Sequence, residues 1–319
     1  MKHRNLLLVC VTVLAWLSTL GANAQFSGVW SQNAMTSLLD NPAAAGNSPC
    51  MDMRIGVRSQ WTGFEGAPLS QFATLSDRFG SGEGVVQGIG ACVVTDAIGP
   101  WSNIRLNVAY SARVRMSEDS RLSAGLAVGL AQFKLDRASL KLPETQAGFD
   151  PALMDGSDSQ LVFPTMDMGL WYENRKTYAS FSILNLTKTP LNNIATGTAP
   201  ASVVVLSGGH YVPLDERFAF RPTAQLRKAA GVPTSIDFRG SFSMNKQVAL
   251  GLGYRTRAAL IATLNVKLLE SLSVGYAYDF GVSSLNPAAR NSHEIVLSIS
   301  ACQKNDPFFG ALGRCPAYE

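Results

Sequence analysis

Charged residues are scarce in this chain of 319 residues, at 16% against roughly 25% in an ordinary soluble domain. The formal net charge of +4 is small for this length, so the basic surface of a nucleic-acid-binding protein is not expected. Apolar residues reach 46%, a content that argues against intrinsic disorder. Beyond residue 24 the chain also lacks any run of 18 apolar residues, which excludes membrane-spanning helices.

The first residues have the composition of an export signal. Residues 2–4 are basic, residues 6–17 are apolar, and Ala22-Asn23-Ala24 has the small-x-small pattern of a cleavage site. We therefore expect a signal peptide over 1–24 and a mature chain that begins at Gln25. An exported chain with no apolar helix is either soluble or a membrane β-barrel.

Long alternating segments favour the barrel. In residues 122–131 leucine, valine and alanine alternate with serine, glycine and alanine, and the same two-residue period runs through 104–115, 248–255, 260–268 and 272–281. Soluble strands usually have about 5–6 residues, whereas tilted membrane strands need about 9–11. One apolar face and one polar face per strand is the pattern of a barrel with lipid outside and a wet lumen inside.

Fourteen such segments can be marked along the chain, so we predict an all-β fold, a transmembrane antiparallel barrel of about 14 strands. An even strand number places both termini in the periplasm. The segments are 52–62, 69–79, 84–95, 101–115, 121–135, 164–174, 176–187, 200–212, 215–227, 232–244, 247–257, 259–268, 271–282 and 291–301. The longest connections, 136–163 and 188–199, then fall on the outer side, as bacterial barrels prefer.

This pattern divides the chain into a signal peptide (1–24), an N-terminal periplasmic or plug segment (25–51), the barrel (52–301) and a periplasmic tail (302–319). Asn41-Pro42 predicts the end of a short helix over 29–39, because the residue before proline avoids helical geometry. Six arginines are expected to line the lumen, either in ion pairs or as an anion-selective pore: Arg105, Arg113, Arg115, Arg217, Arg221 and Arg227.

The sequence offers little material for catalysis. The mature chain has two histidines, His210 and His293, and none of the common zinc, phosphate-loop or nucleophile motifs. Ser292-His293-Glu294 cannot form a triad by itself, because neighbouring strand residues point to opposite faces. We therefore expect no enzyme activity, no metal and no cofactor.

Four cysteines remain in the mature chain, and export exposes them to an oxidising compartment. Cys302 and Cys315 are close in sequence and are candidates for a disulfide. Cys50 can pair with Cys92, which lies in a predicted strand, or with another partner; the pairing cannot be read from one sequence.

Two islands of sequence are more specific than a generic barrel requires. The first contains Asn41-Pro42-Ala43-Ala44-Ala45-Gly46 and then Arg58-Ser59-Gln60-Trp61-Thr62-Gly63-Phe64-Glu65-Gly66-Ala67-Pro68. The second is Tyr276-Ala277-Tyr278-Asp279-Phe280 followed by Ser292-His293-Glu294-Ile295. Together they resemble the PorP/SprF family of outer-membrane proteins of the Bacteroidota. The chain departs from the family pattern at its end, where a tail of 17 residues follows Cys302.

The resemblance implies a non-enzymatic component of the type IX secretion and gliding machinery, which supports export or surface anchoring of proteins. Implied partners are periplasmic ring or lipoprotein components or a secreted adhesin, besides outer-membrane lipid. Loops 136–163 and 188–199 would face a cargo protein, while the two termini would face the periplasmic machinery. A channel for small or lipophilic solutes is the alternative. The loop 60–68 is either a structural hairpin with interfacial aromatic residues or a docking element.

Overall fold

The structure is a computed structural model that describes residues 28–48, 50–80, 84–136, 159–187, 200–282 and 291–301. Helical structure within these ranges is limited to α2 (Ser37–Asp40) and the 3-10 turn η1 (Pro42–Ala44). The predicted helix over 29–39 is therefore wrong in length. Its first half forms turns, because the backbone N–H groups of Ser31 and Gln32 are bound by a carboxylate of the barrel wall instead of a helical carbonyl.

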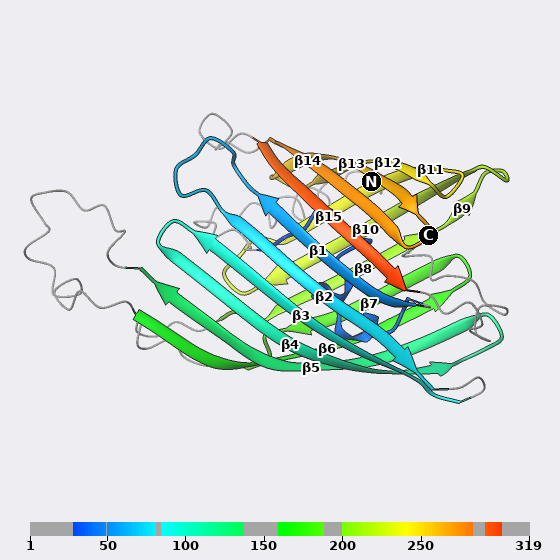
Figure 1. The fold of residues 1–319 in the computed structure, drawn as a ribbon, viewed down its shortest axis with the longest axis horizontal. Helices are drawn as coiled ribbons and strands as arrows, with labels where there is room; N and C mark the ends of the chain where they lie inside the picture. The colour runs from blue at the N-terminus through cyan, green and yellow to red at the C-terminus, as the bar shows by residue number, and fades with distance from the viewer. Residues whose placement is uncertain are drawn as a thin grey trace, which may run out of the picture.

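Within the described residues, fourteen long strands and one short strand form a single antiparallel sheet (Figure 1). The strands are β1 (Met51–Ser59), β2 (Leu69–Phe79), β3 (Val86–Ile98), β4 (Trp101–Arg115), β5 (Ser120–Leu135), β6 (Ser159–Asn174), β7 (Thr177–Leu184), β8 (Val203–His210), β9 (Val212–Pro213), β10 (Phe218–Ala229), β11 (Ser235–Met244), β12 (Val248–Arg255), β13 (Ala259–Leu269), β14 (Leu272–Gly281) and β15 (Asn291–Ala301). The first and last strands, β1 and β15, pair with each other and β10 pairs with β11, so the sheet closes on itself. The predicted fourteen-stranded antiparallel barrel is confirmed.

Some strand limits differ from the prediction for identifiable reasons. The first strand ends at Ser59 and not at residue 62, because the next residues turn into a loop. The ninth predicted segment begins at Phe218 and not at residue 215, because the Asp215 side chain accepts hydrogen bonds from the backbone N–H groups of Arg217 and Phe218. Arg217 therefore lies in an exposed turn, and its predicted place in the lumen is wrong.

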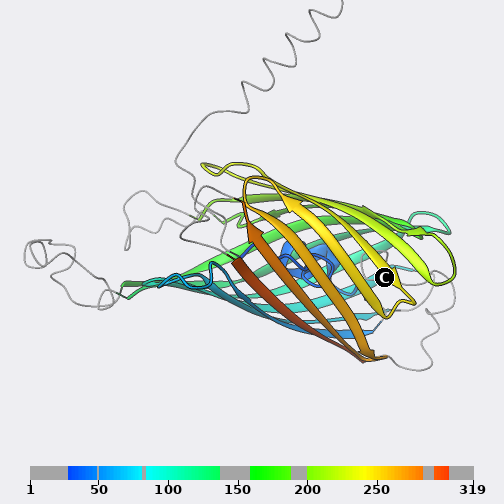
Figure 2. The same cartoon turned by 90° about the horizontal axis from the view of Figure 1, so that it is seen from above.

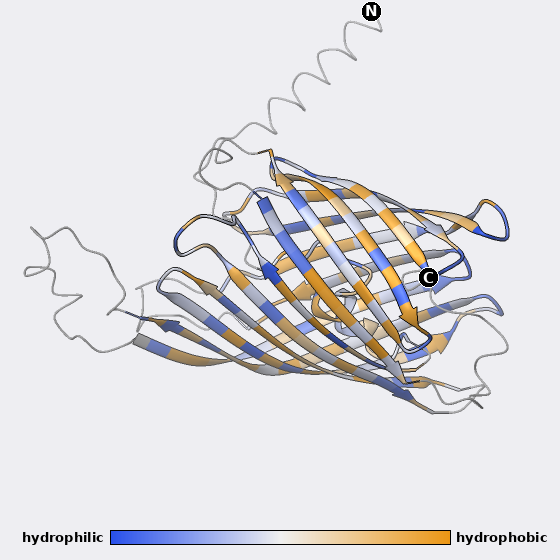
Figure 3. Ribbon diagram, turned by 45° about the horizontal axis from the view of Figure 1, so that its top comes forward, coloured by the Kyte–Doolittle hydropathy of each residue, from blue (hydrophilic) through white to orange (hydrophobic). Residues whose placement is uncertain are grey.

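The two faces of the strands have opposite chemistry. In β1, Ile55 is 44% exposed on the outer wall, whereas Arg58 is 2% exposed on the inner wall. Outward-facing positions are mainly Leu, Ile, Val, Phe and Tyr, and apolar and polar residues alternate along the strands in Figure 3. A lipid bilayer accepts the outer face and a polar interior accepts the inner face, as in outer-membrane barrels.

Connection lengths orient the barrel. At one end the connections include 136–158, 185–202 and 282–290, while at the other end most are as short as 116–119 and 175–176. Bacterial barrels place their longer loops outside the cell and their short turns in the periplasm. We name these the outer end and the periplasmic end, and the first residue of β1 and the last residue of β15 lie at the periplasmic end.

Candidate functional site

Residues 28–48, here called the lumenal segment, run through the interior of the barrel (Figure 2). Gly28 lies beside Asp96, close to the outer end of β3. Asn47 is bound by Arg113, close to the periplasmic end of β4. The segment therefore runs from the outer end to the periplasmic end, where it joins β1. The sequence predicted a periplasmic or plug segment over 25–51, and this path through the lumen favours the plug.

Six charged side chains at the outer end of the lumen form the outer charge cluster. They come from β1, β11, β12, β14 and β15, each within four residues of the outer end of its strand: Arg58, Asp237, Arg239, Arg255, Asp279 and Glu294. Three guanidinium groups face three carboxylates, so the cluster is balanced in charge.

The ion pairs in this cluster are short and buried. Arg58 contacts Asp279 at 2.7 Å and Glu294 at 3.1 Å, and all three side chains are at most 3% exposed. Arg255 contacts Asp279 at 3.2 Å and Asp237 at 3.0 Å, and Arg239 contacts Asp237 at 2.7 Å. Removing one partner of such a pair leaves an uncompensated buried charge, which costs about 3–5 kcal/mol.

The outer charge cluster binds backbone groups at the start of the lumenal segment. The two carboxylate oxygens of Glu294 accept hydrogen bonds from the N–H groups of Ser31 (2.7 Å) and Gln32 (2.8 Å). Arg239 donates to the carbonyl oxygen of Ser31, and the Ser31 hydroxyl donates to Asp279 at 2.8 Å. A buried turn with unpaired N–H and C=O groups is costly, and the wall satisfies these groups in place of helical bonds.

Apolar packing fixes the segment beside the same cluster. Trp30 is 2% exposed and meets Phe72 edge to face, with ring centroids 4.6 Å apart. The Phe72 ring lies across Gly56, where a Cβ atom would approach it to 2.2 Å. Gly56 thus provides the room for an aromatic pair inside a mainly polar lumen.

The motif Asn41-Pro42 is a sharp turn in the middle of the segment. The Asn41 side-chain oxygen caps η1 by accepting from Ala43 N at 2.8 Å, while its nitrogen donates to the carbonyl oxygens of Leu170 (2.9 Å) and Phe181 (3.2 Å). The barrel wall approaches so closely that a Cβ atom at Gly169 would lie 1.9 Å from the Asn41 oxygen. Asparagine meets both demands, because its amide both accepts and donates.

The next residues, Ala43–Ala45 and Gly46, also lie very close to the barrel wall. A Cβ atom at Gly88 would lie 2.2 Å from the Ala45 carbonyl oxygen, and one at Gly125 would lie 2.3 Å from Ala43 N. Gly46 has a φ of +66° and donates its N–H to the Ser76 hydroxyl at 2.8 Å. Only small residues allow the segment and the wall to approach to this distance, which gives this part of the motif a steric explanation.

Asp40 and Asp167 form two further polar contacts inside the lumen. Asp40 binds Arg227 and accepts from Gln225 at 2.9 Å. Asp167 contacts Arg105 at 2.5 Å and accepts from Asn107 at 2.9 Å. Arg105 and Arg227, two of the six predicted lumenal arginines, are therefore held in ion pairs.

The loop 60–68 is built as a fixed structure at the outer end. Trp61 has a φ of +52°, a left-handed conformation that is unfavourable for a bulky residue. Thr62 N donates to Asn291 O at 2.9 Å, and Gly99 N donates to Gly66 O at 2.9 Å, which ties the loop to β15 and to the β3–β4 turn. Phe64 remains 51% exposed.

The other residues of this motif shape the loop. Gln60 N donates to Pro68 O at 2.9 Å and closes its base. Gly63 and Gly66 have positive φ angles of 96° and 72°, which glycine adopts without a steric cost. The hairpin is thus rigid with one half-exposed aromatic side chain at its tip.

His293 and Glu294 are adjacent but point to opposite faces, as the alternation predicts. Glu294 is fully buried in the lumen. His293 lies on the outer wall, where its Nδ1 is 2.7 Å from the Tyr276 hydroxyl and its ring meets Tyr278 edge to face. Of the predicted site residues, Asn41, Pro42, Gly46 and Glu294 thus lie inside the barrel, with Glu294 near the outer end and Gly46 near the periplasmic end. His293 and loop 60–68 lie outside the lumen.

Of the six residues of the outer charge cluster, Glu294 is the one that the sequence had marked as a site residue. Arg239 and Arg255 are not among the six arginines that were predicted to line the lumen, and Asp237 was not connected with them. A signal was present: each of these residues occupies an inward position near the outer end of its strand.

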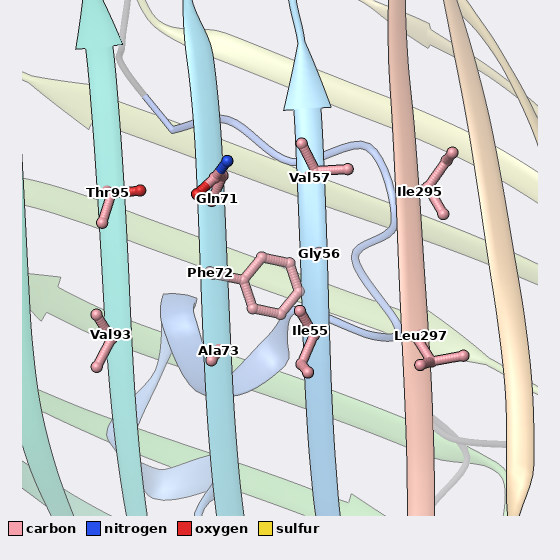
Figure 4. Close-up of a pocket in the computed structure, with 10 residues that line it drawn as sticks. All are labelled: Ile55, Gly56, Val57, Gln71, Phe72, Ala73, Val93, Thr95, Ile295 and Leu297. Atoms are coloured by element: carbon pink, nitrogen blue, oxygen red, sulfur yellow. The ribbon is translucent and has the colours of Figure 1, made fainter.

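The outer wall has a shallow groove of about 530 Å³ over β15, β1, β2 and β3 (Figure 4). Its apolar lining includes Ile55, Val57, Val93, Ile295 and Leu297, and Ala73 forms part of its floor. These side chains belong to the face that a bilayer covers, so the groove lies outside the lumenal site.

Cys50 is disulfide-bonded and Cys92 is free, so the possible pairing of these two is wrong. Cys302 and Cys315 lie outside the described residues, as do the predicted signal peptide, the tail 302–319, the loop 188–199 and most of the loop 136–163. Among the residues that the structure describes, no three His, Cys, Asp or Glu side chains are grouped to hold a metal ion. No helix in the described ranges is long and apolar enough to cross a membrane.

The closed barrel, its apolar wall and the internal segment define an outer-membrane β-barrel with a chain segment inside its lumen. The sequence pattern of the type IX secretion system membrane protein family PorP/SprF matches residues 22–299, and the chain belongs to this family. It is located in the outer membrane. No curated protein sequence gives a significant match.

Solved structures support the same fold. The toluene transporter TodX of Pseudomonas putida is 12% identical, with a TM-score of 0.51 and coverage of 89% of this chain and 96% of that chain. A TodX deltaS2S3 mutant, described as a monoaromatic hydrocarbon channel, is 13% identical, with a TM-score of 0.52 and coverage of 83% and 93%. At these identities the similarity concerns the fold alone.

Proposed function

We propose that this component of type IX secretion acts without catalysis, as a closed barrel that holds partner proteins at its two ends. The observation that carries the proposal is the path of the lumenal segment, from Gly28 beside Asp96 to Asn47 beside Arg113. The lumenal segment crosses the lumen and is bound to the wall by many buried hydrogen bonds and by the Asp40–Arg227 ion pair. Such a lumen is better suited to a fixed scaffold than to the free passage of solutes.

The proposed partners differ between the two ends. At the outer end the fixed loop 60–68 presents Phe64 to a secreted cargo protein or adhesin, because exposed aromatic side chains on rigid loops are favourable contact residues. At the periplasmic end the barrel is proposed to contact ring or lipoprotein components of the machinery. In this proposal residues 25–51 serve as a plug, and the tail 302–319 lies on the periplasmic side.

Gene deletion with complementation tests the proposal. We expect the deletion strain to lose surface display of particular secreted proteins while uptake of small hydrophilic and lipophilic solutes is unchanged. Normal display in the deletion strain would contradict the scaffold function. Loss of lipophilic-solute uptake with normal display would instead favour the alternative, an outer-membrane channel.

A further inference from the structure

Three arginines gather at the periplasmic end of the lumen and are here called the arginine cluster: Arg113 and Arg115 of β4 and Arg121 of β5. All three occupy inward-facing positions of their strands. Arg115 and Arg121 are directly opposite each other in the β4–β5 ladder. Like charges at directly opposed positions repel, so this arrangement is unfavourable unless an anion lies nearby.

Neutral groups hold most of these guanidinium groups. Arg113 is 3% exposed and donates to the Ser123 hydroxyl at 3.1 Å and to the Asn47 side-chain oxygen. Arg115 is exposed and donates to the carbonyl oxygens of Ser117 (3.1 Å) and Glu118 (3.5 Å). Neither bond to a neutral oxygen compensates the charge of the arginine.

Within the described ranges, Glu173 is the carboxylate that pairs with this cluster. Its Oε1 lies 3.9 Å from Arg121, and its Oε2 accepts from Trp171 Nε1 at 3.2 Å. Arg78 adds a further positive charge to the electrostatic surroundings of Arg121. Asp119 pairs with Arg175 at 2.6 Å on the exposed turns, so this carboxylate supplies no counter-charge to the arginines of the lumen.

The outer charge cluster shows what a balanced arrangement looks like in the same barrel. There, three arginines meet three carboxylates at 2.7–3.2 Å. The arginine cluster has the same number of guanidinium groups but one carboxylate at a longer distance. A buried cation such as Arg113 is costly without a counter-ion. The lumen at the periplasmic end therefore carries an excess of positive charge, which further anions would neutralise.

We propose that the arginine cluster binds carboxylate groups of an acidic protein segment that enters from the periplasm. Arginine side chains bind carboxylates in paired hydrogen bonds. All three side chains face the lumen and not the bilayer, so the headgroups of the surrounding leaflet cannot reach them. Arg115 is exposed and Arg121 is partly exposed, so a soluble protein can reach these two, while the buried Arg113 adds its positive charge behind them. Because Arg113 also holds Asn47, the bound segment would lie against the lower part of the lumenal segment.

This inference deepens the proposed function by assigning a chemistry to the periplasmic partner. The test uses the purified full-length chain in detergent, with fluorescently labelled hexaglutamate as the probe and fluorescence anisotropy as the readout. We expect binding that weakens as salt is raised from 50 to 300 mM, since charge pairing is screened. The double substitution Arg115→Gln with Arg121→Gln should weaken binding by about tenfold or more.

Arg217→Gln is the matched control, because Arg217 lies in an exposed turn at the same end of the barrel. It should bind the probe like the wild type. Heat-modifiable migration on a gel shows that each variant is folded; Arg113 is left intact because it is buried. Equal binding by the wild type and the double variant would overturn the proposal.

Two further outcomes would overturn the choice of ligand. If inorganic phosphate binds and hexaglutamate does not, the site is not made for a protein carboxylate. If a chain truncated after Ala301 binds hexaglutamate much more tightly, the chain's own tail is the occupant. Because these measurements use purified protein, they remain informative even if the deletion strain displays its surface proteins normally.

Discussion

The backbone N–H of Ser31 donates to Glu294 at 2.7 Å, across 263 positions of the sequence. This bond joins the start of the lumenal segment to the last strand of the barrel. Since Glu294 also pairs with Arg58 of the first strand, the same carboxylate connects the segment with both strands at the closure of the sheet.

Glu294→Gln should destabilise the barrel by about 3–5 kcal/mol. The substitution keeps the shape of the side chain but leaves Arg58 without this charge partner, and an amide cannot accept from both Ser31 and Gln32 with two oxygens. The denaturant midpoint of the purified barrel should fall, whereas Glu118→Gln, in an exposed turn, should leave it unchanged. Equal midpoints for wild type and Glu294→Gln would refute the structural role given to this carboxylate.

Gly169→Ala should displace the lumenal segment while the barrel still forms. The added Cβ atom would lie 1.9 Å from the Asn41 side-chain oxygen, so the Asn41 turn cannot keep its place. We expect a higher single-channel conductance in planar bilayers than for the wild type. Gly84→Ala is the control, because nothing lies within 4 Å of a Cβ atom there. Identical conductance for all three proteins would show that the segment does not limit flow.

Phe64→Ala should reduce surface display of cargo without reducing the amount of folded barrel. Phe64 is 51% exposed, so its removal costs little stability, but a partner that packs on it would lose a contact. Phe79→Ala removes a similarly exposed aromatic residue at the periplasmic end and is the matched control. If the two variants display cargo equally well, loop 60–68 is a structural hairpin and not a docking element.

Cys50 is expected to bond with Cys302. Met51 and Ala301 are directly paired, and the next residues beyond them are Cys50 and Cys302. This register favours a bond between the two ends of the barrel over the Cys302–Cys315 pairing that the sequence suggested. Peptide mapping by mass spectrometry without reduction distinguishes the two pairings, and a Cys302–Cys315 peptide would contradict the register argument.

An epitope inserted immediately before Gly28 should be reached by antibody on intact cells. Gly28, the first described residue of the lumenal segment, lies at the outer end beside Asp96. An epitope placed after Ala301 follows the periplasmic end of β15 and should need permeabilised cells for labelling. Labelling of both positions only after permeabilisation would show that the segment enters from the periplasm.

The two-residue alternation within each strand was enough to predict the barrel. The structure of its interior depends on contacts between residues that are far apart in the sequence. The alternation of Val248 to Tyr254 is visible in the sequence because each side chain responds to its own face of the strand. The place of Ser31 depends on Glu294, and no local signal connects them. The helix predicted over 29–39 failed for this reason: carboxylates and arginines of the wall replaced the helical hydrogen bonds.

Individual motif residues were predictable to different degrees. Glycines with positive φ, such as Gly63 and Gly66, follow from turn chemistry. Gly169 is needed because Asn41 approaches it from a distant part of the chain, a reason that exists only in the assembled structure. The inward and outward positions of Glu294 and His293 followed from the period of the strand.

The position of Glu294 beside the junction of β1 and β15 has a consequence for biogenesis. The carboxylate that orders Ser31 and Gln32 is on the last strand to be synthesised, so the segment that is made first cannot reach its final bonds until the final strand is present. Binding of the lumenal segment to the wall and pairing of β1 with β15 should therefore occur together, in one late step of insertion. An assembly intermediate that lacks β15 would hold its first residues unanchored, and protease trapping during insertion should detect them.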